Sequence, residues 1–73
     1  MRNPTTTLTP SQRTAFDQLT QHIDAETDPI SSETAVGYIT DGGFERPEAQ
    51  DLLEQLLLKG YLYESTHGLK ITK

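Results

Sequence analysis

One leucine-rich segment, residues 47–59, constrains the fold of this chain more than any other stretch. It begins with a proline and acidic side chains and ends with Lys59 before Gly60, an order typical of an α-helix. At about 100° per residue five of its six apolar side chains share one arc of roughly 140°, so one face of the helix must be buried. These side chains are Ala49, Leu52, Leu53, Leu56 and Leu57. We therefore predict a helix near 46–59 that packs on a core.

The sequence after this helix changes to a two-residue period. Residues 61–63 are β-prone, residues 64–68 are polar and end in Gly68, and residues 69–71 alternate between apolar and polar. This order predicts a hairpin with strands near 61–63 and 69–72. A helix that runs through Lys-Gly into a terminal hairpin is typical of the end of a winged-helix domain.

Two shorter helices are predicted before the leucine-rich one. Thr9 is a suitable N-cap, Pro10 suits the first helical position, and Gln12 stands where a capping box needs Glu or Gln, which predicts a helix over 10–24. Ser31 or Ser32 can cap a second helix that reaches about residue 40.

The connecting residues complete the predicted fold. Ile30 stands where a short strand would pair with the hairpin, and Phe44 should fill the corner between the second and third helices. We expect a small α+β fold, a winged helix-turn-helix over residues 8–73, after a lead-in of residues 1–7. The predicted core consists of the apolar side chains on the inward faces: Leu8, Phe16, Leu19, Ile23, Ile30, Ala35, Ile39, Phe44, Leu52, Leu53, Leu56, Leu62, Leu69 and Ile71, with Leu57 as a further candidate.

Length and composition exclude several classes of function. Seventy-three residues make one small domain, and the absence of cysteine excludes disulfides and thiolate metal sites. No serine or histidine stands in a catalytic motif and no glycine-rich phosphate loop occurs, so we expect no catalytic residue, no cofactor and no metal. No apolar run approaches the roughly 20 residues that span a bilayer and no signal-like segment starts the chain, so a cytoplasmic location without membrane contact is expected.

The charge balance is acidic. Eleven Asp and Glu against six Lys and Arg give a net charge of −5, opposite in sign to the basic surface that binds nucleic acid. Two interpretations stay open: a solvated surface such as a halophilic protein carries, or a patch for a basic partner.

The predicted outward face of the third helix and the wing concentrate these acids. Leu58 falls about 140° from Leu53, on the polar side of the helix. It either packs under the wing against Tyr61 or Tyr63, or it is an apolar contact within an acidic surface that suits a basic amphipathic helix from a protein partner. The residues predicted to bind that partner are Glu48, Asp51, Glu54, Leu58 and Glu64, with Gln55 also facing outward.

Duplex DNA is the alternative ligand, because the third helix of a winged helix commonly enters the major groove. Gln50 could bond an adenine edge, and Arg46 and Lys70 could contact phosphate or guanine. His22 and His67 have simpler roles: His22 should interact with carbonyls at the end of the first helix, and His67 should be a solvated residue of the wing turn.

Several of these runs resemble winged helices of replication proteins. Asp28-Pro29-Ile30 and the tract 57–64, Leu-Leu-Lys-Gly-Tyr-Leu-Tyr-Glu, resemble the C-terminal winged helix of archaeal minichromosome maintenance (MCM) helicases. The first helix, from Leu8-Thr9-Pro10-Ser11-Gln12 onward, is similar to that of the middle subunit of replication protein A. The resemblance implies a non-catalytic domain that modulates a replicative motor or docks helical peptides. We therefore expect an interaction module associated with DNA replication or repair.

Overall fold

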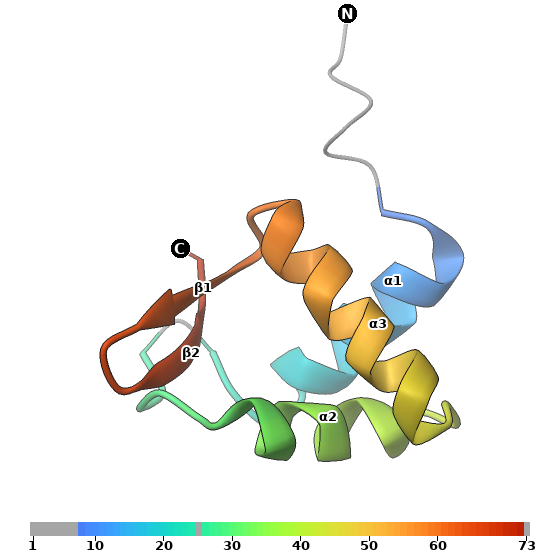
Figure 1. The fold of residues 1–73 in the computed structure, drawn as a ribbon, viewed down its shortest axis with the longest axis horizontal. Helices are drawn as coiled ribbons and strands as arrows, with labels where there is room; N and C mark the ends of the chain where they lie inside the picture. Colours follow the sequence, from blue (N-terminus) through green and yellow to red (C-terminus); the bar gives the residue numbers. More distant parts are fainter. Residues whose placement is uncertain (1–7, 25, 73) are drawn as a thin grey trace, which may run out of the picture.

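The computed structural model describes residues 8–24 and 26–72, and the predicted lead-in of residues 1–7 lies outside them. Within the described part, three helices precede an antiparallel hairpin (Figure 1). The elements are α1 (Pro10–Thr20), α2 (Ser32–Thr40), α3 (Arg46–Leu58), β1 (Leu62–Ser65) and β2 (Gly68–Ile71). This is the small α+β arrangement of a winged helix, as the sequence predicts.

Helix α1 begins with the predicted capping box but ends earlier than predicted. The Gln12 N–H donates to Thr9 Oγ1 at 3.2 Å, and Gln12 Oε1 accepts from the Thr9 N–H at 3.0 Å. The helix ends at Thr20 instead of continuing to Asp24. The Asp24 N–H donates to Thr27 Oγ1 at 2.8 Å instead of continuing the helical pattern. Asp24 Oδ1 in turn accepts from the Glu26 N–H at 2.9 Å and from the Thr27 hydroxyl at 3.0 Å, so these residues form a turn of their own.

Helices α2 and α3 begin and end as their sequences indicate. Ser31 caps α2, because its Oγ accepts from the Thr34 N–H at 3.1 Å. Helix α3 ends in a Schellman motif: the Gly60 N–H donates to the Leu57 carbonyl and the Tyr61 N–H donates to the Leu56 carbonyl. Gly60 has a φ of 86°, a conformation that glycine adopts without a steric penalty.

The hairpin includes more of the polar tract than predicted. Leu62 pairs with Ile71 and Ser65 with Gly68, so the turn contains only two residues and Glu64 lies within β1. Ile30 provides the predicted third strand: its N–H donates to the Leu69 carbonyl at 3.0 Å and its carbonyl accepts from the Leu69 N–H at 2.7 Å.

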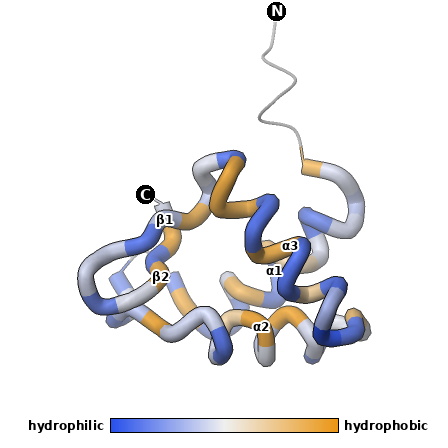
Figure 2. Tube along the Cα trace, in the orientation of Figure 1, coloured by the Kyte–Doolittle hydropathy of each residue, from blue (hydrophilic) through white to orange (hydrophobic). Residues whose placement is uncertain are grey.

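The core lies between the three helices and the inner face of the hairpin, where apolar residues of all five elements meet (Figure 2). Its buried members are Ala15, Leu19, Ile23, Ala35, Val36, Ile39, Ala49, Leu52, Leu53, Leu56, Leu62, Leu69 and Ile71. Four predicted core residues are only partly buried and pack at its margin: Leu8, Phe16, Ile30 and Phe44. Three buried residues were not in the predicted core: Ala15, Val36 and Ala49.

Two aromatic contacts lie at the margin of this core. Phe16 packs edge-on against Tyr61, with ring centroids 5.3 Å apart. His22 stacks on Tyr38 of α2, with centroids 4.0 Å apart and planes within 5° of parallel. This ring contact joins the turn after α1 to α2, whereas the interaction expected between His22 and the carbonyls of α1 stays a prediction.

Candidate functional site

A groove of about 550 Å³ lies between the first half of α2, the length of α3 and the strand β1. Its floor is apolar, because Val36 and Leu53 are buried and Leu57 is partly buried. Polar side chains form its rim: Ser32, Glu33, Arg46, Gln50, Glu54 and Glu64. The groove thus has an apolar floor, which a ligand can cover, and a charged rim. The charges of the rim can select which ligand binds.

Helical periodicity brings the α3 side chains of the groove together. Positions 46, 50, 53 and 57 follow one another at steps of three or four residues, and position 54 stands four residues after position 50, so these positions form one stripe along the helix. This stripe lies next to the core stripe and shares Leu53 with it. Consequently Leu53 both packs in the core and lines the groove.

Glu64 reaches the groove because of the register of the hairpin. Residues directly opposite each other in an antiparallel pair project from the same face, and Glu64 is opposite the buried Leu69. Its side chain therefore points toward the helices like that of Leu62, although it stays exposed at the edge of the core. Lys70 is opposite Tyr63, and both side chains project from the outer face of the hairpin.

The electrostatics of the groove are dominated by acids. Among the described residues that line it, Glu33, Glu54 and Glu64 stand against a single cation, Arg46. Arg46 Nη2 lies 2.9 Å from Glu33 Oε2, so the charge of this cation is already matched inside the chain. The net charge of the described lining is therefore negative, which favours positive over negative charge in the groove.

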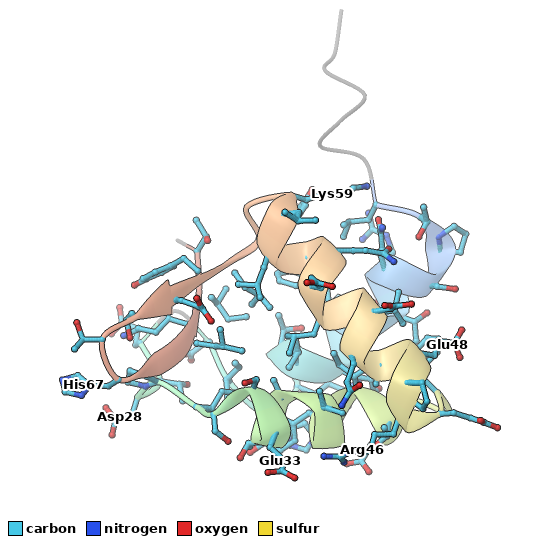
Figure 3. The ribbon with its side chains drawn as sticks, viewed as in Figure 1. Asp28, Glu33, Arg46, Glu48, Lys59 and His67 are labelled. Carbon is cyan, nitrogen blue, oxygen red and sulfur yellow. The ribbon has the colours of Figure 1, made fainter. Side chains whose placement is uncertain are left out.

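The structure divides the predicted protein-binding residues into two groups. Glu54 and Glu64 line the groove, whereas Asp51 and Leu58 lie outside it on the outer face of α3. Glu48 lies on the flank of α3 that faces α1, away from Arg46 and Glu33 (Figure 3). The contact of Gln55 with α1 agrees with this placement, because Gln55 stands seven residues after Glu48 on the same stripe.

The structure also separates the residues that were predicted to bind DNA. Arg46 and Gln50 line the groove, but Lys70 lies on the outer face of the hairpin. The three residues therefore do not form one surface.

Leu58 is exposed, and its predicted packing under the wing is wrong. Its side chain retains 83% of its accessible surface. Tyr61 packs against Phe16 instead, and Tyr63 is itself 45% exposed on the outer face of the hairpin. The other interpretation, an apolar contact point among acidic residues, stays a prediction.

A polar network missed at the sequence level holds α1 and α3 together. Gln12 is buried, with only 5% of its surface exposed. Its Nε2 donates to Gln55 Oε1 at 2.5 Å, and its Oε1 accepts from Lys59 Nζ at 2.8 Å. Gln55 therefore faces α1 and not solvent, contrary to its predicted position. The signal that could have found this is spacing, because Gln12, Ala15 and Leu19 share one buried stripe.

Other kinds of site find no support in the described part of the chain. Within residues 8–24 and 26–72, no three His, Asp or Glu side chains are grouped as a metal ion would require. None of the described helices has the length and apolar character needed to cross a membrane.

Comparisons of the chain with protein-family models, with curated proteins and with solved structures each find no match. The resemblance to winged helices of replication proteins therefore stays a prediction that rests on the residues quoted for it.

Proposed function

We propose that this chain is a non-catalytic protein-interaction module whose binding site is the groove between α2, α3 and β1. Its partner is a basic amphipathic helix. The observation that carries the proposal is the placement of three exposed carboxylates, Glu33, Glu54 and Glu64, around an apolar floor. An amphipathic helix that lays its apolar face into a hydrophobic groove is a recurrent mode of peptide recognition.

The floor and the rim contribute in different ways. Val36 and Leu53 are already almost fully buried, so covering the floor removes further apolar surface mainly at the partly buried Leu57. This burial supplies affinity at roughly 25 cal/mol per Å². Exposed ion pairs at the rim supply little free energy, about 0–1 kcal/mol each, but they determine which sequences bind and how fast. Leu58, one turn beyond Glu54 on the adjoining face of α3, offers an apolar contact for a partner helix that extends past the groove.

Duplex DNA is the competing candidate, because α3 and the hairpin are the surfaces that winged helices present to it. The described cations are poorly placed for this role. Arg46 is paired with Glu33, Lys59 bonds Gln12, and Lys70 projects from the outer face of the hairpin. The remaining described cation, Arg13, lies on α1, which does not line the groove. Phosphates that entered the groove would instead meet Glu54 and Glu64, and repulsion would oppose binding.

An association with DNA replication or repair is part of the proposal, and it rests on the resemblance of residues 8–12, 28–30 and 57–64 to winged helices of replication proteins. A cytoplasmic location belongs to the same proposal.

The test is a measurement of binding affinity by fluorescence anisotropy. The probe is a labelled 18-residue helical peptide that carries Leu on one face and Lys on the opposite face. The double variant Glu54→Lys/Glu64→Lys should lose about 10-fold or more in affinity, since two rim attractions become repulsions. The matched double variant Glu48→Lys/Asp51→Lys changes the net charge equally but leaves the groove intact. It should stay within about threefold of wild type.

Two results would reject the proposal. Equal losses in both double variants would mean that the peptide senses net charge only, as expected of a solvated acidic surface. Tighter binding of a 20-base-pair duplex than of the peptide by the wild-type chain would assign the groove to DNA.

A further inference from the structure

The ion pair between Glu33 and Arg46 spans one end of the groove and joins two helices. Glu33 stands in the first turn of α2, and Arg46 is the first residue of α3. Their side chains are 79% and 53% exposed, and the closest atoms are 2.9 Å apart (Figure 3). The pair therefore meets solvent and can exchange its partners.

The two residues are not equivalent in their own helices. A carboxylate near a helix N-terminus is stabilised by the helix dipole, so Glu33 has a favourable position without Arg46. A guanidinium at a helix N-terminus has the unfavourable sign, so Arg46 depends on Glu33 for compensation. Exposed pairs of this kind contribute little to stability, so the contact opens easily.

We propose, building on the function proposed above, that the Glu33–Arg46 pair sets the charge selectivity of the groove. Glu33 neutralises the one cation that the described lining could offer to a phosphate. Arg46 in turn occupies the carboxylate that a cationic side chain of the partner would take. A basic segment therefore displaces Arg46 from Glu33. A phosphate would instead have to displace Glu33 from Arg46 against the repulsion of Glu54 and Glu64.

Two substitutions test this role of the Glu33–Arg46 pair, because they should change the affinity for the peptide in opposite directions. Arg46→Gln leaves Glu33 free and should raise the affinity for the Leu/Lys helix by about 2- to 5-fold at low salt. Glu33→Gln removes that carboxylate and should lower the affinity by a similar factor. For a 20-base-pair duplex the signs reverse, so that Glu33→Gln gains affinity by freeing Arg46.

Two variants in α1 control for net charge, because no residue of α1 lines the groove. Arg13→Gln matches the charge change of Arg46→Gln, and Asp17→Asn matches that of Glu33→Gln. Both should leave peptide affinity nearly unchanged in about 0.15 M salt, where charges farther than roughly 8 Å are screened. Thermal melts of all four variants check that each one folds.

The outcomes separate this inference from the proposed function. If the wild type binds the helix but the groove variants shift no more than their α1 controls, the selectivity role is wrong while the groove remains the binding site. A loss of peptide affinity in Arg46→Gln would also overturn the inference, since Arg46 would then contact the partner directly. If the wild type fails to bind the helix at about 1 mM, the proposed function and this inference both fall.

Discussion

Gln12 Oε1 accepts a hydrogen bond from Lys59 Nζ at 2.8 Å, which ties the first turn of α1 to the C-cap residue of α3. The same oxygen accepts from the Thr9 N–H, and the amide nitrogen donates to Gln55. One buried side chain thus closes a helix cap and joins two helices that are far apart in the sequence.

Replacing this side chain should destabilise the whole domain. Gln12→Ala removes one hydrogen-bond partner from each of Thr9, Gln55 and Lys59 at once, and we expect a cost of about 1–3 kcal/mol in the free energy of unfolding. Urea denaturation measures it. The matched variant Gln50→Ala, on the exposed rim of the groove, should change stability by less than about 0.5 kcal/mol. Equal effects in the two variants would show that the network contributes nothing.

Two leucines of α3 should differ sharply in their contribution to stability. Leu53 is 5% exposed and Leu58 is 83% exposed. Leu53→Ala should cost about 2–5 kcal/mol, because it leaves a cavity under the groove, whereas Leu58→Ala should cost less than about 0.5 kcal/mol. Thermal or urea denaturation compares them. A loss below about 1 kcal/mol for Leu53→Ala would contradict the core assignment.

Gly68 is required where the hairpin meets the Ile30 strand. Its φ is 142°, and a Cβ at this position would lie 2.6 Å from the Ile30 carbonyl oxygen. Gly68→Ala should therefore cost about 1–3 kcal/mol or more, from backbone strain and from separation of the Ile30 strand. Gly37→Ala is the control, since a Cβ on Gly37 meets nothing within 4 Å. In the middle of α2 this change should stabilise by about 0.5–1 kcal/mol. Chemical denaturation of both variants would show opposite signs.

Asp24 should make stability depend on acidic pH. The Glu26 N–H, and then the Thr27 hydroxyl, hold the pKa of Asp24 below its ordinary value of 3.8. Because the folded pKa is the lower one, the stabilisation is complete above about 3.8 and is lost as the pH falls through the folded value. Asp24→Asn should therefore melt below wild type at pH 7, and the two melting temperatures should converge below that pKa. The control Asp28→Asn should show a smaller difference, and a constant gap for Asp24→Asn would contradict the assignment.

Salt should stabilise the fold. All eleven Asp and Glu side chains are exposed, against only six Lys and Arg residues. Their mutual repulsion is screened as the Debye length falls to about 3 Å at 1 M salt. We expect the melting temperature to rise by at least about 4 °C between 0.05 M and 1 M KCl. The triple variant Asp17→Asn/Asp28→Asn/Glu45→Gln should show a smaller rise, and an equal one would exclude charge repulsion as the cause.

Local patterns in the sequence determined the elements of this protein. The Thr9 capping box, the Ser31 cap, Gly60 after α3 and the leucine spacing each depend on neighbours within about four residues, so the three helices and the hairpin could be predicted. The end of α1 was missed because Asp24 forms its own turn, a local competition that helix periodicity does not report.

Tertiary structure alone decided which charged side chains share a surface. Glu33 pairs with Arg46 across two helices, and hairpin register places Glu64 in the groove and Lys70 outside it. Gln12 and Gln55 meet because α1 packs on α3. Sequence spacing specifies the face of an element on which a residue lies, but contacts between elements depend on how the whole core packs. For this reason the acidic character of the site was visible in the sequence, whereas its groove, its floor and its paired cation were not.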